Sequence, residues 1–168
     1  MRRLATYGLL ILTAVLFQTT VFAKFKLFEV VPDLVVVLVI CFALLEGPTT
    51  GSVVGFAGGF LRDLLLTAPT GLTGLAYLIV GYVIGSVRPY VESTSVFVPI
   101  AGVFFGSLAA SALYGILQQL LGQESVPLGR SVQVVVLIAV YNTLLVPFVY
   151  PLARKFSQME GNKNVYRW

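Results

Sequence analysis

The chain alternates between long apolar stretches and short segments that contain charged residues, glycine or proline. A helix rises about 1.5 Å per residue, so roughly 20 apolar residues cross the hydrocarbon core of a bilayer. We therefore predict an all-α polytopic membrane protein with six transmembrane helices, at residues 4–22, 33–46, 51–66, 72–87, 96–121 and 132–152. The second stretch is short, at about 20 Å, and needs either the preceding segment or a thinned membrane to span.

The composition agrees with this pattern. Hydrophobic residues make up 58% of the 168 residues and charged residues only 11%, whereas a soluble domain carries roughly 25% charged residues. Such a chain has too little polar surface to cover itself in water. The length suits one domain, and we expect a transmembrane domain at residues 1–153 followed by a basic cytoplasmic tail at residues 154–168.

The positive charges predict an orientation, because lysine and arginine favour the cytoplasmic side of a membrane protein. With six spans and a cytoplasmic N-terminus, the cytoplasmic side carries Arg2, Arg3, Arg88, Arg154, Lys155, Lys163 and Arg167, and the outer side carries Lys24, Lys26, Arg62 and Arg130. The excess favours both termini in the cytoplasm. We interpret the net charge of +4 as an orientation signal and expect no nucleic-acid partner.

The third apolar stretch is rich in glycine and has two different faces. On a helical wheel, a narrow arc holds Gly51, Gly55, Gly58 and Arg62, with Ser52, Gly59 and Asp63 beside it. The opposite side holds Val53, Val54, Ala57, Phe60, Leu61, Leu64 and Leu65. Small residues let a neighbouring backbone approach closely in a membrane. We therefore predict that the glycine face is a slot that contacts a partner chain or a lipid, and that the opposite side faces lipid.

The polar residues within the apolar stretches are few, and each has two interpretations. Arg62 and Asp63, a pair of opposite charge, are expected to point into the helix group or toward a cavity. The alternative interpretation is that they mark where the helix meets the lipid headgroups. Pro32 and Asp33 fit the start of a helix. Asn142 is suited to a hydrogen bond between helices. A cavity ringed by Arg62, Asp63 and Asn142 would hold a lipid or a cell-wall precursor.

The sequence lacks the residues that most catalytic and metal sites use. It contains no histidine and a single cysteine, Cys41, so we predict no catalytic residue, no metal ligand and no cofactor. Asp33 and Asp63 lie at one membrane level in the predicted topology and could act as acid and base. Helix starts and span ends are common positions for carboxylates, which favours a structural role for both.

Three short motifs follow one another in a specific order. They are Pro32, Asp33 and Leu34 at the second stretch, Gly55, Phe56, Gly59 and Asp63 in the third, and Pro69 and Gly71 before the fourth, which continues Gly74-Leu75-Ala76-Tyr77. This order resembles the bacterial rod shape-determining protein MreD family, and the size, six-span hydropathy and basic ends fit along the whole chain. Arg62 directly before Asp63 departs from the family's pattern.

The resemblance implies a non-enzymatic component of the cell-elongation machinery in the bacterial cytoplasmic (inner) membrane. Proteins of this family work beside the bitopic protein MreC and help to regulate peptidoglycan synthesis. MreC connects them to the elongation penicillin-binding transpeptidase and a RodA-type glycosyltransferase, with the actin-like MreB below the membrane. The predicted glycine slot would then receive the single span of MreC.

The family's fold is similar to the six-helix substrate-binding component of energy-coupling-factor vitamin transporters. A transporter component of this type is therefore the alternative function. It needs a pocket with several converging polar groups, and the few polar residues within the predicted spans favour the scaffold instead.

Overall fold

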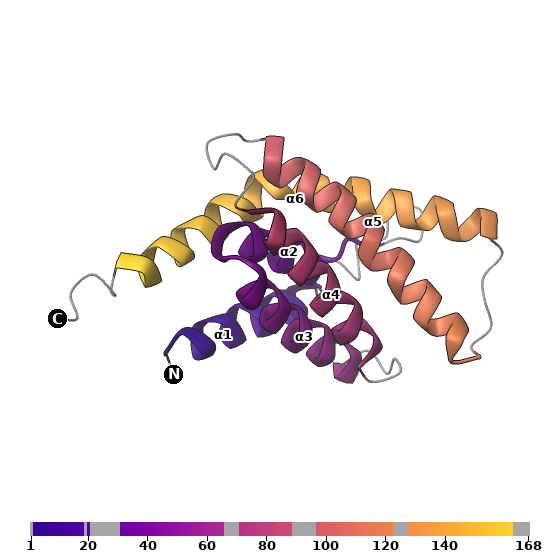
Figure 1. Ribbon diagram of the computed structural model, residues 1–168, viewed down its shortest axis with the longest axis horizontal. Coiled ribbons are helices and arrows are strands. Elements are labelled where there is room, and N and C mark those ends of the chain that lie inside the picture. The colour runs from indigo at the N-terminus through magenta and orange to yellow at the C-terminus, as the bar shows by residue number, and fades with distance from the viewer. Residues whose placement is uncertain are drawn as a thin grey trace.

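The computed structural model describes residues 2–18, 20, 31–65, 71–88, 97–122 and 128–162. Within these residues the regular secondary structure is helical, and the six α-helices are α1 (Arg2–Phe17), α2 (Leu34–Glu46), α3 (Pro48–Leu65), α4 (Leu72–Val87), α5 (Phe97–Leu120) and α6 (Leu128–Asn162). Figure 1 shows α5 and α6 lying together on one side of the group formed by α1 to α4. The all-α prediction is therefore confirmed for the described residues.

The predicted boundaries agree best where glycine and proline separate the apolar stretches. The bounds of α4 are those predicted, and α2 ends at Glu46 because Gly47 follows with a φ of 100° and its N–H bonds the carbonyl oxygen of Ala43. Pro48 then begins α3. At this position proline loses no helical hydrogen bond, since the first amides of a helix have no intrahelical acceptor.

The last helix differs from the prediction, and the end of the first is only partly described. Helix α1 ends at Phe17, residues 18 and 20 are π-helical, and residues 19, 21 and 22 of the predicted span lie outside the described residues. Helix α6 continues to Asn162, ten residues past the predicted end at residue 152, so the first part of the expected tail is helical. Residues 163–168 of that tail and the motif residue Pro69 lie outside the described residues.

Helix α2 lies at the centre of the fold. Residues 35–43 are all buried, and α1, α3, α4, α5 and α6 each contact this helix. Its sequence is apolar on every side, which is the pattern expected of a helix surrounded by other helices.

Helices α3 and α4 meet backbone to backbone. A Cβ added at Gly59 would lie 2.6 Å from the Cα of Gly74, and one added at Gly51 would lie 2.5 Å from the carbonyl oxygen of Gly81. Gly55 meets the carbonyl group of Tyr77 in the same way. The glycine face therefore contacts α4 of the same chain, and the prediction that it forms an open slot for another chain is wrong.

The remaining faces of α3 differ in burial. A Cβ added at Gly58 would meet Val35 of α2 at 2.8 Å and Ile11 of α1 at 3.4 Å, so this glycine packs within the chain as well. Val54 is also buried there, which corrects its predicted position on the lipid side. The predicted outer face is otherwise exposed at Val53, Phe60, Leu64 and Leu65.

Two helical segments, Phe97–Leu120 and Ser131–Gln158, are long and apolar enough to cross a membrane by length and composition. Shorter apolar helical segments lie at Tyr7–Phe17, Leu34–Glu46 and Leu72–Val87. Six membrane crossings therefore stay a prediction.

Candidate functional site

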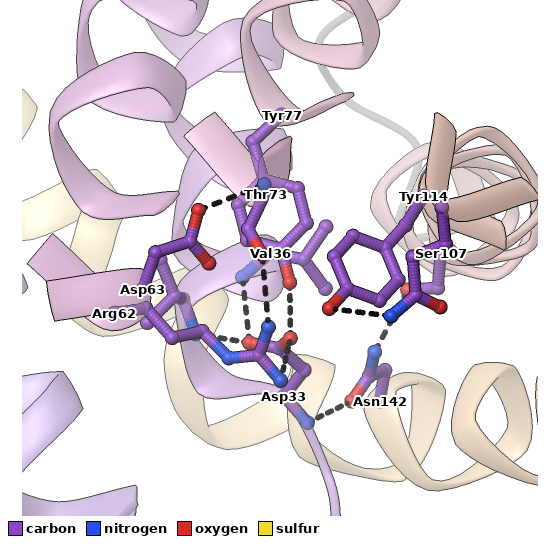
Figure 2. Close-up of polar contacts among 11 residues, drawn as sticks. Asp33, Val36, Arg62, Asp63, Thr73, Tyr77, Ser107, Tyr114 and Asn142 are labelled. Atoms are coloured by element: carbon purple, nitrogen blue, oxygen red, sulfur yellow. Dashed lines mark hydrogen bonds and ion pairs between the residues drawn. The ribbon is translucent and has the colours of Figure 1, made fainter. Parts of the chain in front are cut away.

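Asp33 lies directly before α2 and caps its N-terminus. Its Oδ1 accepts hydrogen bonds from the backbone N–H groups of Val35 and Val36 at 3.1 and 3.3 Å. A carboxylate at this position satisfies amides that have no intrahelical acceptor and lies at the positive end of the helix dipole. Its Oδ2 accepts a hydrogen bond from the hydroxyl of Tyr77 and lies 3.5 Å from Nη2 of Arg62 (Figure 2). Asp33 therefore links α2 to α3 and α4.

Arg62, near the end of α3, forms its ion pair with Asp33. Its Nη1 also lies 3.5 Å from the hydroxyl oxygen of Thr73, and its side chain is 26% exposed. The buried Nε has no hydrogen-bond partner among the described residues. Arg62 therefore pairs with Asp33 at the start of another helix, and the opposite charge next to it in the sequence, Asp63, has a different role.

Asp63 caps α4 from the neighbouring helix. Its Oδ2 accepts hydrogen bonds from the backbone N–H groups of Gly71 and Thr73 at 3.0 and 2.9 Å. Gly71 precedes α4 with a φ of 99° and has no side chain that could cap the helix, so the carboxylate comes from α3 instead. Asp63 is only 1% exposed, and its Oδ1 has no hydrogen-bond partner among the described residues.

Asn142 of α6 connects the start of α2 to α5. Its Oδ1 accepts a hydrogen bond from the backbone N–H of Asp33 at 2.7 Å, and its Nδ2 donates one to the hydroxyl of Ser107 at 3.0 Å. Asn142 and Ser107 are both fully buried. The predicted hydrogen bond between helices is therefore present (Figure 2).

A cavity of about 460 Å³ opens beside these hydrogen-bonded and charged residues, between α2, α3 and α4 on one side and α5 and α6 on the other. Its lining residues are Val31, Asp33, Val36, Arg62, Asp63, Thr73, Tyr77, Ala110, Ser111, Tyr114, Gly115, Gln118, Ser131, Val134, Val135 and Ile138. Arg62 and Asp63 line the cavity as predicted. Asn142 is not among the lining residues, so its predicted place around the cavity is wrong.

Four polar residues here were not predicted from the sequence, namely Thr73, Tyr77, Ser107 and Tyr114. Helical spacing was an available signal for all four. Thr73 and Tyr77 are four residues apart and share a face of α4, and Ser107 and Tyr114 are seven residues apart on one face of α5.

The fold is helical, two of its helices are long and apolar enough to cross a membrane, and the charged residues Asp33, Arg62 and Asp63 link α2, α3 and α4. A family model described as rod shape-determining protein MreD matches residues 1–156. The chain belongs to the MreD family, whose members are membrane components that determine rod shape and are generally not enzymes.

Comparison with curated proteins and with solved structures finds no match. The family match gives no support to the alternative function, a vitamin-transporter component. Asp33 and Asn142 form hydrogen bonds within the chain, and a role of Pro32, Asp33 and Asn142 as a structural motif of the family stays a prediction.

Proposed function

We propose that the chain is a non-enzymatic scaffold of the bacterial cell-elongation machinery in the inner membrane. In this proposal it crosses the membrane six times, has both termini in the cytoplasm and binds MreC. Through MreC it helps to regulate peptidoglycan synthesis by the penicillin-binding transpeptidase and the RodA-type glycosyltransferase, in concert with MreB. We also propose that its six-helix architecture is similar to that of the substrate-binding component of energy-coupling-factor transporters. The observation that carries the proposal is the family match over residues 1–156.

The packing of the glycines restricts where MreC could bind. Because α4 covers Gly51, Gly55 and Gly59, a partner helix must use side chains that remain exposed on the surface. Each of the helices α3 to α6 presents such a side chain in Phe56, Tyr82, Phe105 and Phe148, respectively. In a membrane these faces contact either lipid or a partner helix.

Site-specific photocrosslinking combined with co-purification tests the proposal. A photoreactive amino acid is placed, one at a time, at Phe56, Tyr82, Phe105 and Phe148, and the chain is purified in detergent with MreC. We expect MreC to co-purify and to crosslink from at least one of these positions. Val54, a buried residue two positions from Phe56 on the same helix, is the matched control and should give no crosslink to MreC.

Failure of MreC to co-purify, together with no crosslink from any exposed position, would contradict the scaffold proposal. Equal crosslinking from Val54 and Phe56 would show that the reaction does not depend on surface contact.

A further inference from the structure

The cavity beside α5 and α6 has two walls of different chemistry. One wall carries the charged and hydroxyl groups of Asp33, Arg62, Asp63 and Tyr77, and the wall formed by α6 carries Val134, Val135 and Ile138 together with Ser131. Its volume of about 460 Å³ lies within the range of roughly 300–1,000 Å³ that is usual for small-molecule sites. A ligand that fits both walls has a polar end and an apolar end.

The charges of the polar wall do not balance. Two carboxylates, of Asp33 and Asp63, face one guanidinium, of Arg62, so the described lining residues carry one excess negative charge. A ligand with only negative charge would add repulsion to this site, since charges interact strongly where water is excluded. The charge count therefore favours a ligand that brings at least one positive group.

Two buried atoms of the polar wall, one acceptor and one donor, have no hydrogen-bond partner among the described residues. Oδ1 of Asp63 is an acceptor on a side chain that is 99% buried, and Nε of Arg62 is a donor. Both oxygens of Asp33 are already in use. A buried polar group without a partner is costly, so a ligand that satisfies both atoms would gain free energy on binding.

We propose that the cavity binds a zwitterionic headgroup in which a primary ammonium lies a few bonds from a phosphate, as in phosphoethanolamine and the phospholipids that carry it. Oδ1 of Asp63 and Nε of Arg62 are covered in the unliganded chain, so on binding both side chains turn these atoms toward the cavity, where the ammonium donates to Oδ1 and a phosphate oxygen accepts from Nε. The acyl chains of a phospholipid lie against Val134, Val135 and Ile138. A purely anionic headgroup leaves Asp63 without a donor, and a simple amine leaves Arg62 without an acceptor.

This inference goes beyond the scaffold function and does not depend on MreC, so it is tested on the chain alone. The full chain is purified in detergent and mixed with equal amounts of phosphatidylethanolamine and phosphatidylglycerol of identical acyl chains. Native mass spectrometry then measures which lipid remains bound. We expect retention of phosphatidylethanolamine to exceed that of phosphatidylglycerol about tenfold, the ratio that corresponds to one charge-assisted hydrogen bond. Equal retention, a preference for phosphatidylglycerol, or no retained lipid and no bound phosphoethanolamine overturns the proposal.

Asp63→Asn changes the chemistry of the proposed contact and keeps the helix cap. The amide oxygen still accepts from the N–H groups of Gly71 and Thr73, while an NH₂ group replaces the free acceptor and the negative charge is lost. We expect the preference for phosphatidylethanolamine to disappear. The matched control is Glu46→Gln, which also removes one charge from a residue with a buried, unpartnered oxygen but does not line the cavity. This control should keep the preference.

Ser111→Phe provides a second variant in case Asp63→Asn does not fold. Ser111 lines the cavity and is only half-buried, so a phenyl ring there occupies ligand space. We expect this variant to lose both lipids, and retained binding would show that the ligand does not bind in this cavity.

Addition of soluble phosphoethanolamine separates two sources of the ligand. Displacement of the lipid, or binding of phosphoethanolamine without any lipid, assigns the headgroup as the recognised unit, and no displacement from a bound lipid assigns the whole phospholipid. Either result supports the headgroup chemistry, provided that Asp63→Asn abolishes the preference.

Discussion

Asn142 has no exposed surface and contacts two other helices at once. Its amide group accepts from the backbone of Asp33 and donates to Ser107, so it uses both ends of the side chain. Hydrogen bonds between helices in membranes contribute only about 0.6 kcal/mol on average. The cost of losing Asn142 is larger than this, because its removal leaves the buried N–H of Asp33 without a partner.

Replacement of this residue tests the argument. We expect Asn142→Leu to destabilise the chain by about 1–3 kcal/mol, the usual cost of an orphaned buried polar group. In a protein of this size that corresponds to a fall of about 5 °C in the temperature of thermal unfolding in detergent. Gln133→Leu, on an exposed position of the same helix, is the matched control and should change this temperature little. Equal melting temperatures for Asn142→Leu and the wild type would contradict the structural role.

At the scale of elements, α3 and α4 meet backbone to backbone at their glycines. A Cβ added at Gly55 would lie 2.6 Å from the carbonyl carbon of Tyr77, and this neighbour is backbone that cannot rotate away. Alanine is a better helix former than glycine by about 1 kcal/mol. Helix propensity and packing therefore predict opposite effects for the same substitution.

We expect packing to dominate, so that Gly55→Ala lowers the stability of the purified chain in the absence of any partner. Gly8→Ala in α1 is the matched control, because a Cβ there would meet nothing within 4 Å, and propensity alone should leave this variant unchanged or more stable. Thermal unfolding of both variants in detergent measures the difference. A Gly55→Ala chain that is as stable as the Gly8→Ala chain would show that α3 and α4 do not pack as described.

The sequence predicted where helices begin and end better than it predicted which helices pack against each other. Glycine and proline fixed the ends of α2 and the start of α3, because their backbone requirements are local. The glycine stripe indicated a close helix contact, but spacing along one helix cannot identify which helix fills it, and the contact proved to be with α4. Similarly, Asp33, Arg62 and Asp63 were recognised as the charged group, whereas the pairing of Arg62 with Asp33 depends on tertiary structure.

At the scale of the whole molecule, the helix order places the start of α1 and the end of α6 on the same side of the helix group (Figure 1). The cluster of Asp33, Arg62 and Asp63 joins the start of α2, the end of α3 and the start of α4. In the proposed topology these helix ends face the outside of the cell. The basic termini would then lie in the cytoplasm.

Cysteine labelling tests this topology, because Cys41 is the single native cysteine and is buried. In a Cys41→Ala background, one cysteine is placed at Leu121, at the end of α5, or at Gln158, in the last turns of α6. Both positions are exposed. A membrane-impermeant maleimide should label Leu121→Cys in intact spheroplasts and Gln158→Cys only after permeabilisation. The reverse pattern would contradict the proposed orientation.

The direct backbone contact of α3 with α4 also determines where the molecule can change shape. Two helices that touch through glycines, and that share the carboxylate of Asp63 at one end, have no side-chain layer through which they could slide. They should therefore move as one rigid body. The boundary between this rigid body and helices α5 and α6 contains side chains and a cavity, so a hinge motion is expected there. A molecule that fills the cavity would then determine the angle between the two groups of helices.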